Sequence, residues 1–536
     1  MLFSIKDNKI IGEKVNSFEN KRYKIDYEGL IFIKGLKPGY NSLEVFADQF
    51  EKSGTSTFSI LSGNFICCIK DKKNNIYYII NDNGGSKNIY YSDNYISTSF
   101  LNLLKIEDYK VNDLVEKNIV EYIITGFQFT KDMFLKNIKK LDIYEYFKIK
   151  NSNLNIEMNK SSNPFLKSKD SEPVNSFLIN MEKITKSLAD YNISVDLTGG
   201  TDTRITTEIL NYYGLNFETA TSGTKNHSDI LISKKVAKQM SLKHKTVLHK
   251  VNFNKLWEEI DETFLKVDGL CDPVKYHRLY KLFINRKQRG VDISIGSSGG
   301  ELYKDGGWWR TALKVYGINK NEKIINHLID SGLIGWGIKM PNNYNLFSSK
   351  LNNLSKNYKS LVKDRIKKLE YSNVNNKFKF ADKIFYEYSV RSPRGFIDNQ
   401  VINYSPLLDP DLVKIGINLN NYDRFFHRFY RMILDKINSK TASINTNRGN
   451  MVMSKGINNI FKDFFNILYS QFKENNIPKN DPELYNYIKK SSKYINIINS
   501  LKEYDILNKN INASEIEDYY VGKLINLYKI IEIIDR

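Results

Sequence analysis

Between residues 174 and 295 the sequence alternates helical patterns with short apolar segments, and no other part of the chain limits the possible folds so strongly. Helical periodicity covers 174–189, 202–210 and 228–240, whereas segments typical of strands cover 193–197, 217–221, 246–251 and 291–295. Strands that alternate with helices form parallel sheets with right-handed crossovers. We therefore expect an α/β fold built on a parallel sheet in this part of the chain.

The strand expected over 193–197 runs into a glycine-containing turn, Thr198-Gly199-Gly200-Thr201-Asp202-Thr203, before a helix begins. Two adjacent glycines let a ligand approach the backbone closely, and the NH groups at the start of a helix attract anions. The threonines add hydroxyl groups, and the Asp202 carboxylate can hold a magnesium ion. These features predict a pyrophosphate cradle. The alternative is a tight strand-to-helix turn in which Asp202 is the N-cap.

The turn is not one of the best-known nucleotide-binding motifs, because the sequence has no G-x-x-x-x-G-K-[ST] and no G-x-G-x-x-G after a strand. It resembles the S-G-G-x-D-S signature of PP-loop ATP pyrophosphatases, with threonines in place of both serines. Further segments along nearly the whole chain resemble the asparagine synthetase family, which includes β-lactam synthetases and lasso-peptide cyclases. These segments are Thr221-Ser222-Gly223 with Asp229, Gly296–Tyr303 (G-x-G-x-D-E-L-F in the family), Ser405–Val413 (P-F-L-D-x-x-L-V), Arg428–Ile444 and, in the amino-terminal part, Gly63–Phe65, Asn81–Gly84 with Tyr90–Tyr91, and Tyr122–Leu141.

The resemblance implies a division of the 536 residues into two domains and a linker. Residues 1–150, which show mostly strand patterns, correspond to a strand-rich, Ntn-hydrolase-like (glutaminase-like) domain. Residues 151–173 are polar and contain Pro164 and Pro173, so they are the expected linker. Residues 174–536 correspond to a PP-loop domain of the adenine nucleotide α-hydrolase-like fold, with a parallel sheet and a helical C-terminal region.

The resemblance also implies an activity, which is ATP-dependent amide-bond formation. A ligase or cyclase of this kind adenylates a substrate carboxylate, releases pyrophosphate and transfers the acyl group to an amine, with ATP and Mg²⁺ as cofactors. Asp202 and Glu301 are the implied metal ligands and catalytic carboxylates. The implied ATP-binding residues lie in two loops and at strand ends, and they are Leu197, Thr198, Gly199, Gly200, Thr201, Asp202, Thr203, Thr221, Ser222, Gly296, Ser297, Ser298 and Gly299.

The amino-terminal domain departs from the family pattern at its nucleophile. Leu2 stands where a working glutaminase domain has a cysteine, and a leucine side chain offers no nucleophilic atom. Cys67 and Cys68 fall inside an expected strand and are predicted to be core residues. We therefore expect no glutamine hydrolysis, a structural role for this domain, and an amine that comes from the substrate or from free ammonia.

Two positions in the second domain also depart from the pattern. Gly300 stands where the magnesium loop has an aspartate, which removes an anionic oxygen ligand. Asn450 stands where the family has a late lysine that stabilises acyl transfer. Arg448 and Lys455 are the two candidates to replace that lysine as catalytic residues, and the sequence does not choose between them.

The roles of four further residues stay open at this level. Arg204, in the first turn of the expected helix, is either a contact to substrate or phosphate or a solvated helix residue. His277, Trp308 and Trp309 lie near the second loop in sequence. They either line an acceptor pocket or pack in the core, as aromatic residues more commonly do.

The chain carries 80 Lys and Arg against 60 Asp and Glu, a formal net charge of +20. This charge fits a nucleic-acid partner, but the lysines are spread along the chain, which favours a general compositional bias. A PP-loop enzyme acting on tRNA is one alternative function. A non-catalytic nucleotide-binding protein is another, suggested by Leu2, Gly300 and Asn450 together. We expect small-molecule or peptide carboxylate and amine substrates in natural-product, peptide or polysaccharide biosynthesis, while self-association and a biosynthetic partner protein stay open.

Membrane and disulfide signals are weak. The first residues lack the continuous apolar core of a signal peptide, and no apolar run approaches the roughly 18 residues of a spanning helix. Two of the three cysteines are neighbours, which disfavours a disulfide framework. These observations predict a soluble, cytoplasmic protein without a membrane partner.

Overall fold

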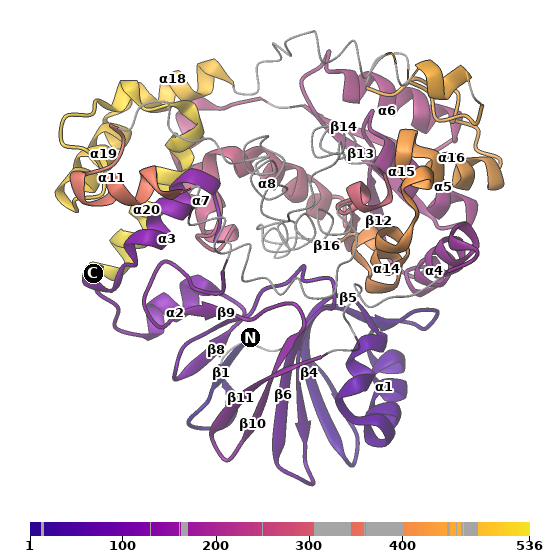
Figure 1. The fold of residues 1–536 in the computed structure, drawn as a ribbon, viewed down its shortest axis with the longest axis horizontal. Helices are drawn as coiled ribbons and strands as arrows, with labels where there is room; N and C mark the ends of the chain where they lie inside the picture. The colour runs from indigo at the N-terminus through magenta and orange to yellow at the C-terminus, as the bar shows by residue number, and fades with distance from the viewer. Residues whose placement is uncertain are drawn as a thin grey trace.

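The computed structural model describes the chain except for residues 12–14, 129, 160, 162–169, 249, 305–344, 359, 361–400, 448–450, 457, 463–464 and 466–480. The described residues form two antiparallel sheets, one parallel sheet and the helices that surround them. Figure 1 shows the antiparallel sheets at one end of the molecule and the parallel sheet at the other.

The region from residue 2 to residue 158 contains both antiparallel sheets. The larger has the strand order β11-β10-β6-β5-β4-β3, and the smaller has the order β2-β1-β8-β7-β9. Their strands are β1 (Leu2–Ser4), β2 (Lys9–Ile11), β3 (Asn16–Glu19), β4 (Tyr23–Ile33), β5 (Leu61–Asp71), β6 (Ile76–Asn81), β7 (Tyr90–Tyr91), β8 (Tyr95–Ser97), β9 (Lys139–Lys140), β10 (Glu145–Lys150) and β11 (Asn153–Met158).

The two sheets pack face to face, and helices cover their outer faces, which gives four layers. A buried cluster that includes Phe3, Cys68 and Phe147 fills the space between the two sheets. Helix α1 (Tyr40–Ser53) covers the outer face of the larger sheet, and α2 (Phe100–Ile106) and α3 (Glu116–Thr125) cover the outer face of the smaller one. This helix–sheet–sheet–helix order is consistent with an Ntn-like domain, although the strand-dominated prediction did not foresee its helices.

Cys67 and Cys68 point to opposite faces of β5, because successive side chains in a strand alternate. Cys67 lies in the cluster beneath α1, and Cys68 lies between the sheets. Both thiols are fully buried, and burial raises the pKa of each above its usual range. The prediction that they are core residues is confirmed.

The segment 151–173 differs from the predicted linker over its first part. Asn153–Met158 forms β11, an edge strand that pairs antiparallel with β10, so that Ile156 lies opposite Phe147. The alternation of Leu154, Ile156 and Met158 with polar residues is a strand signal, which the polar composition of the segment obscured. The larger sheet therefore extends to residue 158.

The predicted parallel sheet is confirmed in the second region. Its strands are β12 (Ile193–Asp196), β13 (Phe217–Gly223), β14 (His244–Leu248), β15 (Ile293–Ile295) and β16 (Ile402–Tyr404), in the order β14-β13-β12-β15-β16, and every neighbouring pair is parallel. β12, β13 and β14 are added in sequence order toward one edge of the sheet. The chain then returns to the other side of β12, where it forms β15 and β16. The connecting helices include α4 (Pro173–Ser187), α5 (Thr201–Tyr212), α6 (Ser228–Gln239), α7 (Leu256–Lys266) and α8 (Pro273–Gln288).

The described C-terminal part is helical, as predicted, apart from strand β16. In Figure 1, α14 (Pro410–Asn418), α15 (Asn421–Arg424) and α16 (Arg428–Lys436) lie with α4 and α5 in one lobe beside the parallel sheet. The opposite lobe contains α3 and α7 with α11 (Ser349–Lys356), α18 (Pro482–Lys490), α19 (Ser492–Glu503) and α20 (Asp518–Ile534). None of the described helices combines the length and apolar character needed to cross a membrane.

A buried carboxylate joins the antiparallel sheets to the parallel-sheet region. Asp409 accepts hydrogen bonds from Lys34 Nζ at 2.9 Å and Ser62 Oγ at 2.7 Å, and it caps α14 by accepting from the Asp411 NH group at 3.1 Å. Burial opposes the charge on Lys34, but Asp409 and Asp411 outweigh it and raise the pKa of that ammonium. Asp409 thus couples the two regions electrostatically.

We predict that Asp409→Ala destabilises the protein by about 3 kcal/mol, because it removes a helix cap and weakens the neutralisation of a mostly buried ammonium. Asp411→Ala is the matched control, since its exposed carboxylate binds the same ammonium, and it should cost about 0.5 kcal/mol. Melting temperatures measure the difference. Equal losses in the two variants would show that Asp409 does not couple the regions.

Candidate functional site

The two predicted loops lie side by side at the centre of the parallel sheet. β12 and β15 are adjacent and parallel, with Val195 opposite Ile295, so the loops that follow them leave the same edge of the sheet. The strand order reverses between these two strands, and ligands of open α/β sheets bind at the carboxyl edge where such a reversal occurs. The second loop also contacts the helix that follows the first loop, because the Ser297 hydroxyl donates to the hydroxyl of Thr206 in α5 at 3.0 Å.

A buried arginine beneath the loops ties these two strands together. Arg286, from α8, donates to Ser194 Oγ at 3.1 Å on β12 and to Ser294 Oγ at 2.7 Å on β15. Its guanidinium also binds the Asp196 carboxylate at 2.5 Å, at the end of β12. Arg286 thus adds a charged side-chain link between two strands that are already paired through their backbones.

The first loop is organised by its threonine hydroxyls. Thr203 Oγ1 accepts from the Thr198 NH group and lies 3.0 Å from Thr198 Oγ1, which accepts from the Gly200 NH group at 3.1 Å. Helix α5 begins at Thr201 with Gly200 as its N-cap, and this glycine has no side chain to bind the NH groups of the first turn. Asp202 therefore lies inside the first turn, and the alternative that it is the N-cap is wrong. The arrangement leaves a helix N-terminus suited to an anion.

Gly199 is required by packing against another part of the protein. A Cβ atom there would lie 2.9 Å from Asn447 Cβ and 3.0 Å from an Asp229 carboxylate oxygen. That oxygen accepts from the Gly199 NH group at 2.9 Å and from Asn447 Nδ2 at 3.0 Å, and the Asn447 NH group donates to the Gly199 carbonyl at 2.9 Å. The segment before residue 448 is thus fixed against the loop.

Arg204, in α5, binds the segment 441–445 that precedes Asn447. It is fully buried and donates to the carbonyl oxygens of Ile444 at 2.6 Å and Asn445 at 3.0 Å. Burial lowers the pKa of this guanidinium to about 10, although the nearby Glu208 opposes the shift. Neither role considered for Arg204 from the sequence, a ligand contact or a solvated residue, fits this position.

Contacts with the end of β16 fix the second loop. The Gly296 NH group donates to the Tyr404 carbonyl at 2.9 Å, and the Ser405 hydroxyl donates to the Ser298 carbonyl at 2.8 Å. Gly299 has φ +89°, and a Cβ atom there would lie 2.7 Å from Leu408 Cδ2, so only glycine fits without strain.

Thr221 and Ser222 lie at the end of β13, next to β12. The Thr221 hydroxyl is buried and donates to the Leu197 carbonyl, so its hydrogen is engaged in a bond within the protein. Ser222 is only partly buried. Of these two predicted contacts, Ser222 is the better placed to meet a ligand.

Asp202 is held by residues that the sequence analysis did not identify. The Lys304 ammonium binds its carboxylate at 2.5 Å, and Tyr430, whose hydroxyl donates to the Gly300 carbonyl at 3.1 Å, lies beside the same carboxylate. Burial, assisted by the negative charge of Asp202, raises the pKa of Tyr430 well above its usual value, so this group stays a phenol. Lys304 lies one residue beyond the recognised loop pattern, and no spacing rule pointed to it.

The acidic residues do not fit the magnesium site that the resemblance implies. The Asp202 carboxylate is paired with an ammonium, Gly300 supplies no oxygen from a side chain, and Glu301 stands alone as the second carboxylate. Within the described ranges, no three His, Cys, Asp or Glu side chains gather as a metal-binding group.

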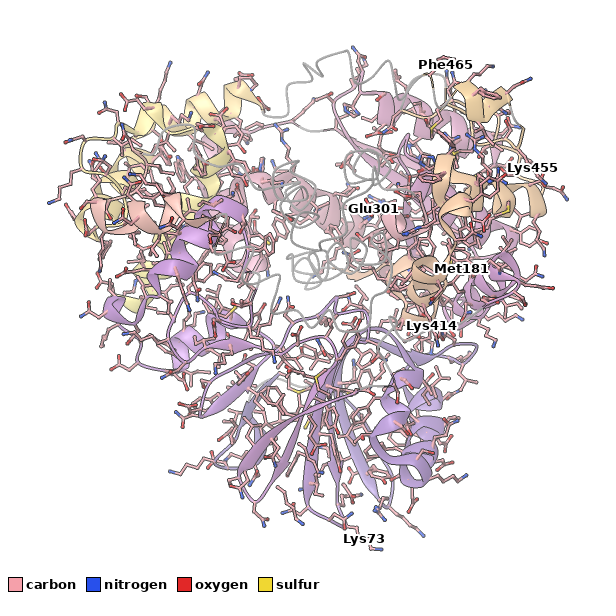
Figure 2. The ribbon with its side chains drawn as sticks, viewed as in Figure 1. Lys73, Met181, Glu301, Lys414, Lys455 and Phe465 are labelled. Atoms are coloured by element: carbon pink, nitrogen blue, oxygen red, sulfur yellow. The ribbon has the colours of Figure 1, made fainter. Side chains whose placement is uncertain are left out.

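Of the two candidates for the late basic residue, the structure describes only Lys455, which is not brought to the loops. Lys455 is largely exposed, and its ammonium binds Asp435 at 2.9 Å. Figure 2 shows Lys455 toward the outer margin of the lobe, away from Glu301. Arg448 lies outside the described residues, as do Trp308 and Trp309. His277 is buried with Nδ1 2.6 Å from the Val274 carbonyl, and burial lowers its pKa, which supports the packing role.

Comparison with known proteins identifies a similarity in the amino-terminal region. A family model described as a glutamine amidotransferase domain matches residues 39–160, which run from the start of α1 to the end of β11. This match is consistent with the amino-terminal domain of asparagine synthetase-like proteins. A search of the curated proteins found no match.

The amino-terminal residues of this domain offer no thiol. Leu2 lies in β1, paired with Ile11 on one side and Ser97 on the other. The three cysteines of the chain are all buried. The position to which the resemblance assigns the nucleophile is therefore occupied by an apolar strand residue.

We predict that Arg204→Ala loosens the segment 441–447, because three backbone carbonyls lose their buried charged donor. The cost should be about 3 kcal/mol, seen as a lower melting temperature and faster hydrogen exchange in peptides covering 441–447. Lys436→Ala, which removes an exposed cation from α16, is the control and should change neither quantity. Unchanged hydrogen exchange in Arg204→Ala would show that Arg204 does not hold the segment 441–447 in place.

Proposed function

We propose that this protein is an ATP-dependent amide-bond-forming ligase or cyclase that adenylates a substrate carboxylate. The observation that carries the proposal is the meeting of two glycine-containing loops, 198–203 and 296–300, at the carboxyl edge of β12 and β15. An anion-binding helix N-terminus and a fixed second loop at one reversal point suit a nucleotide that is cleaved between its α and β phosphates.

In this scheme a carboxylate oxygen attacks the α-phosphorus of ATP, a new oxygen–phosphorus bond forms, and pyrophosphate leaves. The NH groups of the first turn of α5 and the hydroxyls of Thr198 and Thr203 are proposed to bind the leaving pyrophosphate, where negative charge develops. Magnesium would accompany the phosphates of ATP and would neutralise part of their charge. An amine then attacks the acyl carbon, an amide bond forms, and AMP leaves.

The amine is proposed to come from the substrate or from free ammonia. The amidotransferase-like domain has Leu2 in place of a nucleophile, and its cysteines are buried. Its role in the proposal is structural, because Asp409 anchors the parallel-sheet region on Lys34 and Ser62. A carboxylate and an amine from natural-product, peptide or polysaccharide biosynthesis are the proposed substrates.

A non-catalytic nucleotide-binding role is the second candidate. It is favoured by the pairing of Asp202 with Lys304, which takes up a carboxylate that the resemblance assigns to magnesium. The two candidates differ in one property, because only an enzyme exchanges pyrophosphate into ATP when the correct acid is present.

We predict carboxylate-dependent exchange of labelled pyrophosphate into ATP when a panel of acids is tested with wild-type protein and Mg²⁺. Thr203→Val should lower this exchange about a hundredfold, because it removes a hydroxyl from the loop that binds the leaving group. Thr263→Val is the control, since its buried hydroxyl binds a carbonyl within α7, and it should leave exchange unchanged. ATP binding without exchange for any acid would favour the non-catalytic role, and absence of ATP binding would contradict both candidates.

A further inference from the structure

Lys304 is a mostly buried cation at the base of the first loop. Only 5% of the residue is exposed, and its ammonium contacts Asp202 Oδ2 at 2.5 Å. A buried ammonium is costly unless a charged partner and hydrogen bonds compensate it. Asp202 compensates the charge from the first turn of α5, the same turn whose uncapped NH groups suit an anion. A lysine side chain has three donors, so one bond to Asp202 leaves donors for phosphate oxygens.

The absence of a side chain at residue 300 makes this arrangement possible. A Cβ atom on Gly300 would lie 2.3 Å from Asp202 Cγ and 2.5 Å from Asp202 Oδ1, much closer than atoms can approach. An aspartate at residue 300 and the present position of Asp202 therefore exclude each other. Tyr430 contacts both residues, since its hydroxyl donates to the Gly300 carbonyl and lies beside the Asp202 carboxylate.

A magnesium site with two carboxylates and an ion pair of lysine with aspartate have the same net charge. A dication held by two carboxylates carries no net charge, and an ammonium held by one carboxylate carries none either. Gly300 removes a carboxylate from the pattern that this loop resembles, and the Lys304 ammonium supplies positive charge beside the remaining Asp202 carboxylate.

We propose that the Lys304 ammonium, held by Asp202, is the fixed cation that binds the leaving pyrophosphate, in place of a magnesium ion bound by the protein. This proposal rests on the proposed function and makes it more specific. Pyrophosphate binding then requires no metal ion beyond the one that accompanies the phosphates.

Calorimetry with inorganic pyrophosphate tests the proposal without knowledge of the acid. Lys304→Met, which keeps an unbranched apolar stem and removes the charge, should bind pyrophosphate about ten- to a hundredfold more weakly than wild type. Lys489→Met is the matched control, because Lys489 is also a mostly buried lysine that binds an aspartate, Asp518, but lies in the opposite lobe. It should bind as wild type does.

A double variant separates a binding role from a structural one. Lys304→Met leaves Asp202 without its cation, so Lys304→Met/Asp202→Asn removes both charges and relieves that strain on folding. Weak pyrophosphate binding by the folded double variant supports the proposal. Binding equal to wild type shows that the ion pair only positions the loop, and it overturns the proposal.

The stoichiometry of metal binding gives an independent readout. Electron paramagnetic resonance of Mn²⁺ in the presence of pyrophosphate should show one protein-associated ion for wild type, and two ions would overturn the proposal. Failure of the proposed function is distinguishable, because it appears as absent exchange of pyrophosphate into ATP while pyrophosphate binding still depends on Lys304.

Discussion

The guanidinium of Arg286 holds together the two strands on which the candidate site is built. It donates to a serine on each strand and binds Asp196 at the point where β12 ends. Each of these groups would be costly to bury alone, and together they satisfy one another. The backbone ladder sets the spacing of β12 and β15, and Arg286 reinforces that pairing next to the loops that follow the two strands.

The site is assembled from segments that are distant in sequence. The first loop is packed against 441–447 through Gly199 and Arg204, and the second is packed against the end of β16. Tyr430, from α16, joins Asp202 to Gly300. The C-terminal helices are therefore part of the site and not merely a cover for the sheet. The proposed chemistry depends on this convergence, since a pyrophosphate must be met from both loops at once.

Sequence patterns predicted the parallel sheet because its short apolar strands are separated by clear helical periodicity and glycine turns. The family resemblance assigned both loops to one ATP site, and in the structure they follow adjacent parallel strands that end at the same edge. They missed β11, whose exposed, polar-rich edge position resembles a linker, and they missed the burial of Arg204, which depends on a segment more than two hundred residues away. The pairing of Lys304 with Asp202 could not be predicted from the sequence for the same reason, because it joins two segments that only the fold brings together.

The most direct test of the central claim is a crystal structure of the protein with α,β-methylene ATP, which cannot be cleaved between its α and β phosphates. The account predicts that the β and γ phosphates lie between residues 198–203 and 296–301, against the first turn of α5 and the Lys304 ammonium. A nucleotide bound elsewhere, or phosphates directed away from these loops, would contradict it.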